Sequence, residues 1–202
     1  VKFENYINDT RSKIIIWFFN LLDKSEHLIG FEYIDRAICL FDKAINSTNY
    51  DNMLNKVLLI SCLQLAYKFR DNDDNKYRDK IEEIIILANR YESISLTRIE
   101  INMAEILICN LLHWDFRILT ITDISKNCLR DMKTIFNYIC KKVFIDMYIH
   151  IIQKSIELFN ISVLGEARLV ASVLSLTISQ FQTNMYIENA LIKILTRLRK
   201  QY

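Results

Sequence analysis

The stretch from residue 57 to residue 69 reads VLLISCLQLAYKF, and Lys68 is its first charged side chain. A segment that is apolar on every side is typical of a helix that is buried over most of its surface. At about 1.5 Å per residue it is too short to cross a bilayer. We therefore expect a helix over residues 52–69 at the centre of a globular bundle.

A second nearly apolar helix, capped by Ser95 or Thr97, is expected to run to His113 or Trp114. Between residues 101 and 112, Glu105 is its only charge. The other elements expected before residue 117 are helices over 10–23, 25–45 and 81–91 and a polar loop, DNDDNKYRDK, over 71–80.

After residue 116 the helical pattern starts again. A helix capped by Thr120 or Thr122 is expected to reach residue 130. Further helices are expected over 132–159, which could be broken near 144–147, and over 161–180 and 188–200. The sequence thus predicts an all-α fold with two helical bundles in tandem, over residues 1–117 and 118–202, of which the second is short.

Composition agrees with an all-α fold. The chain holds 51% hydrophobic residues and 25% charged ones, with no Pro and only 2 Gly, two residues that helix interiors exclude. A net charge of +2 gives no sign of a nucleic-acid or membrane partner. No apolar run reaches the length of about 18 residues that a membrane span needs.

The five cysteines are scattered at positions 39, 62, 109, 128 and 140. None forms a CxxC pair, and their number is odd, so neither a disulfide framework nor a zinc site is expected. Free cysteines fit a reducing compartment, and we expect the protein in the nucleus, the cytoplasm or both.

Catalytic motifs are missing from the sequence. Two glycines could not build a phosphate-cradling loop, and there is no nucleophile elbow. The three histidines, His27, His113 and His150, have no partners at metal-ligand spacing. The acidic segment 71–74 lacks the Gly and closing Glu of a calcium loop. We expect no enzyme activity, no cofactor and no metal.

Two sets of charges lie beside apolar helix faces. Lys68 ends one buried helix and Glu105 interrupts another, and a charge near a core needs a partner. The pattern alone favours an internal Lys68–Glu105 ion pair over a docking role. Arg11 and Asp35 form the second set, for which we expect a charge-assisted bond between the first two helices.

Four segments in the first bundle resemble motifs of the cyclin family. Residues 11–17 (RSKIIIW) resemble the family's MRAIL…W region, and residues 33–36 (YIDR) match its YIDR. Residues 65–69 (LAYKF) resemble LASKF, and residues 103–116 (MAEILICNLLHWDF) resemble RMEHLVLKVLTFDL. The resemblance covers residues 10–122; beyond them the chain is similar only in its helix pattern.

The resemblance implies two five-helix cyclin boxes and a regulatory role. By this resemblance the chain would form a heterodimer with a cyclin-dependent Ser/Thr protein kinase and activate it by docking on its C-helix. Arg11 and Asp35 would form the ion pair that braces the first two helices. The positions that match the family's kinase-binding residues are Lys68, Phe69, Glu105, Cys109, Trp114 and Phe116.

The groove with which some cyclins recruit RxL-type substrates is degenerate here. Ile14 and Trp17 keep its apolar character, whereas Thr10, Lys13 and Asn55 replace apolar residues. A lysine in the floor weakens an apolar peptide anchor, so we expect no recruitment of such substrates. The alternative hypothesis is a transcription-factor-IIB-like cyclin fold that binds DNA and transcription machinery, but this would need a basic surface.

Overall fold

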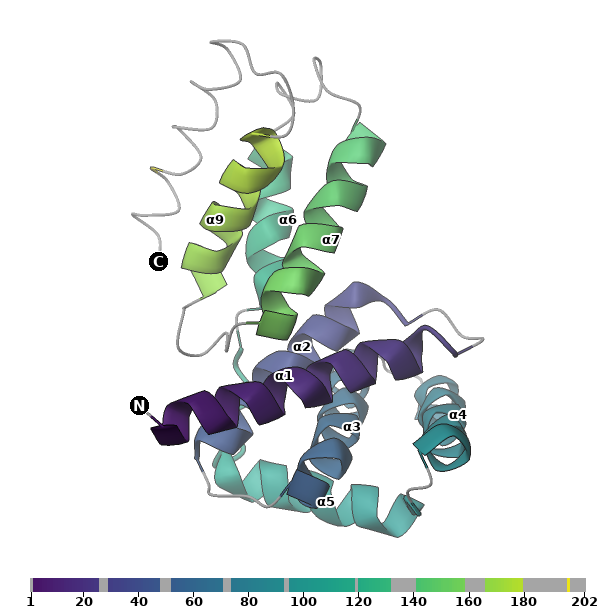
Figure 1. Cartoon of the computed structure of the whole chain (residues 1–202). Helices are drawn as coiled ribbons and strands as arrows, with labels where there is room; N and C mark the ends of the chain where they lie inside the picture. The colour runs from purple at the N-terminus through teal and green to yellow at the C-terminus, as the bar shows by residue number, and fades with distance from the viewer. Residues whose placement is uncertain are drawn as a thin grey trace. The chain divides into compact units, whose positions relative to one another are not determined.

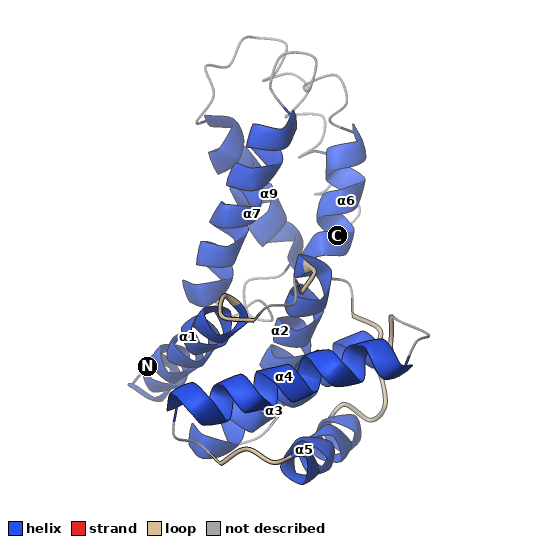
Figure 2. Ribbon diagram, turned by 90° about the vertical axis from the view of Figure 1, so that its right-hand side faces the viewer, coloured by secondary structure: helices blue, strands red, loops and turns tan. Residues whose placement is uncertain are grey.

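The computed structural model describes residues 2–25, 29–47, 52–70, 74–92, 95–118, 120–131, 141–158 and 166–179, together with Thr196. Within these residues the regular structure is helical and there is no strand, which confirms the all-α prediction (Figures 1 and 2). The chain divides into two compact units, Val1–Ile118 and Leu119–Tyr202. The predicted boundary lay between residues 117 and 118.

The first unit is built around α3 (Asn52–Lys68). This helix contacts each of the other four helices of the unit, as predicted for the central helix (Figure 1). Those helices are α1 (Lys2–Leu22), α2 (Phe31–Asn46), α4 (Asp74–Glu92) and α5 (Arg98–Leu111).

The burial of α3 follows from its uncharged sequence. Every residue from 58 to 67 is buried, so the helix excludes water on all sides. Ser61 is one of its buried polar groups with partners: its hydroxyl shares its single proton between the carbonyl oxygens of Val57 at 2.8 Å and of Ile101 at 2.9 Å. The second of these bonds ties α3 to α5 within the core.

The first two helices begin at other residues than predicted. α1 starts at Lys2 rather than at Thr10, and α2 starts at Phe31 rather than at Ser25. Gly30 precedes α2 in an extended conformation, with φ −60° and ψ 136°. Ser25 is therefore not a helix cap; its hydroxyl donates instead to Glu83 Oε1 on α4 at 3.0 Å.

The predicted loop over residues 71–80 is wrong from Asp74 onward, because α4 begins there. Tyr77 is buried, with its ring centroid 6.5 Å from that of Tyr67 on α3. This contact makes Tyr77 the first residue of the apolar face that Ile81, Ile84 and Ile85 continue. Acidic residues at the start of a helix are also favoured by the helix dipole.

Arg11 on α1 forms a buried two-point ion pair with Asp42 on α2. Its Nε donates to Oδ1 at 2.6 Å and a terminal nitrogen donates to Oδ2 at 2.9 Å. Asp42 lies two turns beyond Asp35, the partner predicted for Arg11. Asp35 is buried and accepts a hydrogen bond from Cys39 Sγ at 3.7 Å. The predicted pairing of Asp35 with Arg11 stays a prediction.

The second unit contains α6 (Ile121–Asp131), α7 (Lys141–Leu158) and α9 (Glu166–Ser179). α9 contacts both α6 and α7. Residues 144, 148, 152 and 156 are buried at four-residue intervals, which gives α7 one continuous apolar face. The break that could have interrupted this helix near 144–147 is absent. Thr120 precedes α6, and its hydroxyl and backbone N–H both contact Asp123 Oδ2.

Residues 132–140, including Cys140, and the predicted helix over 188–200 apart from Thr196 lie outside the described residues. None of the described helices combines the length and the apolar character that crossing a membrane would require.

Candidate functional site

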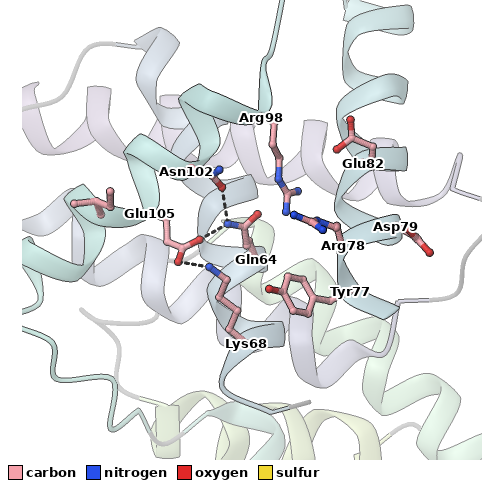
Figure 3. Close-up of a pocket in the computed structure, with 10 residues that line it drawn as sticks. Gln64, Lys68, Tyr77, Arg78, Asp79, Glu82, Arg98, Asn102 and Glu105 are labelled. Atoms are coloured by element: carbon pink, nitrogen blue, oxygen red, sulfur yellow. Dashed lines mark hydrogen bonds and ion pairs between the residues drawn. The ribbon is translucent and has the colours of Figure 1, made fainter. Parts of the chain in front are cut away.

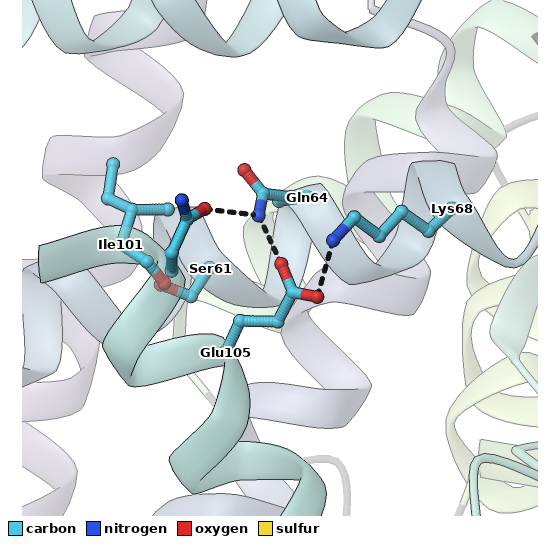
Figure 4. A network of polar contacts seen from close by, with 6 residues as sticks. Ser61, Gln64, Lys68, Ile101 and Glu105 are labelled. Atoms are coloured by element: carbon cyan, nitrogen blue, oxygen red, sulfur yellow. Dashed lines mark hydrogen bonds and ion pairs between the residues drawn. The ribbon is translucent and has the colours of Figure 1, made fainter. Parts of the chain in front are cut away.

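Lys68 and Glu105 meet at the edge of the first unit, where α3 ends beside α5. Lys68 Nζ lies 2.5 Å from Glu105 Oε1 (Figure 4). The Lys68 side chain is 37% exposed and that of Glu105 is 15% exposed. The structure therefore contains the internal ion pair that the charge pattern favoured, and the lysine end of the pair remains open to solvent.

Gln64 holds the second oxygen of Glu105. This glutamine lies one turn before Lys68 and is only 1% exposed. Its amide nitrogen donates to Glu105 Oε2 (Figure 4) and, at 3.1 Å, to Asn102 Oδ1 (Figure 3). Two acceptors fix the orientation of the amide, and Glu105 is thereby held in one position by two donors from α3.

Three aromatic side chains follow the two charged residues along the chain, Phe69 directly after Lys68 and Trp114 and Phe116 after Glu105. The Phe69 and Phe116 ring centroids are 4.4 Å apart, and the Trp114 ring meets Phe116 edge-on at 6.3 Å. Phe69 is 51% exposed and Trp114 is 67% exposed. An exposed aromatic cluster of this kind is a feature of protein–protein interfaces.

The backbone turns sharply after α5 to place Trp114. His113 and Trp114 have φ angles of 50° and 60°, in the left-handed region that residues with a side chain rarely adopt. The Trp114 N–H donates to the carbonyl of Cys109 at 2.9 Å, which closes the helix end. Strained backbone of this kind concentrates at functional sites.

Cys109 does not contribute exposed surface, because it is only 4% exposed. Burial raises the pKa of its thiol, and the nearby negative charge of Glu105 raises it further. Cys109 therefore stays a neutral thiol beneath the charged pair.

The first turn of α5 is fixed by a capping box. The Thr97 hydroxyl accepts from the Glu100 N–H at 3.3 Å, and Glu100 Oε2 accepts from the Thr97 N–H at 2.8 Å. This confirms Thr97 as the cap. On the outer face of the same helix, Ile99, Met103 and Ile106 are exposed. Their spacing forms an apolar stripe beside Asn102 and Glu105.

The predicted substrate groove has little open apolar surface. Ile14 and Trp17 are buried, and Lys56 Nζ lies 4.6 Å from the centre of the Trp17 ring. Lys13 is exposed and Thr10 partly exposed, whereas the Asn55 side chain lies outside the described part of the chain. The absence of RxL recruitment stays a prediction.

Sequence reasoning missed the residues that surround the charged pair. Gln64 is the only amide side chain between Val57 and Tyr67, and an amide in an apolar helix signals a buried hydrogen-bond network. Arg78 was missed because the start of α4 was assigned to a loop.

No known protein family matches the sequence, and neither does any curated protein. Among the described residues, no three His, Cys, Asp or Glu side chains come together as a metal site would require.

Proposed function

We propose that this chain is a cyclin-type regulatory subunit that binds a cyclin-dependent Ser/Thr protein kinase and activates it. The observation that carries the proposal is the Lys68–Glu105 pair, held at 2.5 Å at the edge of α3 and α5. Both residues occupy positions where the sequence resembles the kinase-docking motifs of cyclins. The proposed role is regulatory rather than catalytic.

The pair retains capacity to bind a partner. An ammonium group has three donors, and Lys68 donates one of them to Glu105. Each carboxylate oxygen can accept two hydrogen bonds. A partner helix could thus place a backbone carbonyl against Lys68 and a backbone N–H against Glu105.

The aromatic cluster of Phe69, Phe116 and Trp114 supplies apolar area to the same docking face. Aromatic side chains in the desolvated centre of an interface contribute much of the binding energy. Ion pairs as exposed as Lys68–Glu105 contribute only about 0–1 kcal/mol to stability. Their removal should therefore leave the fold intact.

Activation would follow from binding one kinase state more tightly than the other. A rigid face that packs against the inward C-helix stabilises the kinase conformation with its Lys–Glu ion pair formed and its activation loop released. The regulatory subunit itself need not change shape.

Affinity capture from a lysate of the source cells tests the proposal. The docking variant is Lys68→Ala/Glu105→Ala. The matched control is Lys154→Ala/Glu157→Ala, which removes another exposed pair, with Nζ and Oε2 2.9 Å apart on α7.

We expect the unmodified chain and the control variant to capture a cyclin-dependent-type kinase and the docking variant to lose it, with all three equally helical by circular dichroism. Equal capture by all three would contradict the assigned docking face. Capture of no kinase, together with a salt-dependent shift of duplex DNA, would instead favour the transcription-factor-IIB-like alternative.

A further inference from the structure

A polar groove opens directly beside the Lys68–Glu105 pair. It has a volume of about 780 Å³ and lies between α4 and α5, with Gln64 of α3 among its lining residues (Figure 3). α4 contributes Arg78 and Glu82 to the lining, and α5 contributes Arg98.

Two arginines of the groove lack a counter-charge. Neither Arg78 nor Arg98 makes an ion pair or hydrogen bond with any residue in the described ranges. One terminal nitrogen of Arg98 is enclosed without an acceptor. Figure 3 shows both side chains extending toward the middle of the groove. Two positive groups facing one site attract an anion, and guanidinium groups bind carboxylates through paired hydrogen bonds.

Gln64 adds an unsatisfied acceptor to the same groove. Because its amide nitrogen is held by Asn102 and Glu105, its Oε1 is fixed on the opposite side. This oxygen is buried and accepts no hydrogen bond. A buried acceptor without a donor costs free energy, so a ligand that supplies an N–H is favoured.

The positive charge of the groove is local to Arg78 and Arg98. Asp79 and Glu82 line the same α4 wall as Arg78, and in Figure 3 the Asp79 carboxylate points away from the two guanidinium groups. Lys68 and Glu105 neutralise each other. Arg78 and Arg98 are therefore matched in number by Asp79 and Glu82, and the site for an anion is the pair of guanidinium groups itself, which can hold one carboxylate through paired hydrogen bonds.

We propose that Arg78 and Arg98 bind an Asp or Glu side chain of the docked kinase, and that Gln64 Oε1 accepts a backbone N–H from the same segment. The inference rests on the proposed function, since the groove continues the Lys68–Glu105 docking face. It makes this groove a determinant of which kinase is bound.

A titration of the purified full chain with sodium acetate, at constant ionic strength, tests the pocket without a kinase. The readout is the arginine side-chain N–H resonances, observed by nuclear magnetic resonance. Arg90 is the internal control, because it is exposed on α4 and does not line the groove. We expect saturable shifts for Arg78 and Arg98 only. Shifts no larger than those of Arg90 would overturn the pocket.

The second arm measures the affinity of the captured kinase, purified, for Arg78→Gln/Arg98→Gln and for Arg90→Gln. Loss of charge-assisted hydrogen bonds should weaken binding about tenfold or more in the double variant, with no change for Arg90→Gln. Unchanged affinity of the double variant, beside loss in Lys68→Ala/Glu105→Ala, would overturn this inference and leave the proposed function standing. If no kinase binds even the unmodified chain, the proposed function and the acidic occupant both fall, while the acetate result still decides the pocket.

Discussion

Glu105 illustrates how much of the site depends on single side chains. One of its oxygens is paired with Lys68 and the other with Gln64. The sequence predicted the first partner, because a lone charge in an apolar helix requires one. It did not predict the second, because Gln64 differs from its apolar neighbours only in one amide group.

The strained residues after α5 lead to a first prediction. Left-handed backbone costs a residue with a side chain about 1–2 kcal/mol, and glycine avoids this cost but loses more entropy on folding. His113 has a φ of 50°. The substitution His113→Gly should therefore raise the free energy of unfolding of the protein by up to about 1 kcal/mol. Urea unfolding measures this change. The control Asn110→Gly, inside the last turn of α5, should lower the stability, and an equal loss in both variants would show that residue 113 is not strained.

The cysteines next to the site give a prediction for alkaline pH. Burial raises the pKa of Cys109 and of Cys62 above the ordinary 9.0. A group whose pKa is raised by folding contributes stability below its unfolded pKa and loses it as pH rises toward the folded one. Unfolding free energy should thus fall as pH rises above about 9. Urea unfolding at pH 7 to 10 should show a weaker fall for Cys109→Ala, and identical slopes would contradict the assignment.

At the scale of elements, the central helices were predictable and the start of α4 was not. The apolar runs of α3 and α5 are long enough to identify each helix, although α5 ends at Leu111 and not at residue 113 or 114 as predicted. In contrast, every residue from Asp74 to Lys80 except Tyr77 is polar, so the segment resembles a loop. The packing of Tyr77 against Tyr67 anchors the start of α4, and this contact joins two different helices, which the local sequence pattern does not show.

The capping box of α5 yields a prediction about Thr97. Its hydroxyl accepts from the Glu100 N–H, and loss of such a cap typically costs about 1 kcal/mol. Thr97→Ala should lower the unfolding free energy by that amount, measured by thermal or urea unfolding. Thr97→Ser keeps the hydroxyl and should stay near the unmodified protein. Equal losses in the two variants would show that the methyl group, not the hydrogen bond, matters.

The buried Arg11–Asp42 pair joins two elements and can be tested by a double-mutant cycle. Removal of one partner leaves a buried charge and should cost about 3–5 kcal/mol, whereas an apolar replacement of both is often much less costly. Arg11→Met should therefore destabilise the protein strongly, and Arg11→Met/Asp42→Leu should recover part of the loss. An additive loss in the double variant would mean that Asp42 is not the essential partner of Arg11. The same cycle with Asp35, the partner that the sequence predicted for Arg11, would then be the next experiment.

On the scale of the whole molecule, the all-helical class and the division into two units follow from hydrophobic patterning. Apolar helices separated by polar segments are enough to predict both. The finer assignment, a tandem of cyclin boxes, rests on four motifs between residues 11 and 116 and remains part of the proposal. The second unit contributes no such motif. Beyond residue 122 the sequence resembles the cyclin family only in its pattern of helices.

The central claim concerns activation, so a phosphorylation assay tests it most directly. The kinase recovered by affinity capture would be produced alone, and its rate on a Ser/Thr peptide measured with and without the purified full chain. If the active conformation rises from about 1% to nearly full occupancy, the rate should increase on the order of a hundredfold. The Lys68→Ala/Glu105→Ala variant should give little increase at the same concentration. A bound kinase whose rate is unchanged by the chain would contradict the account.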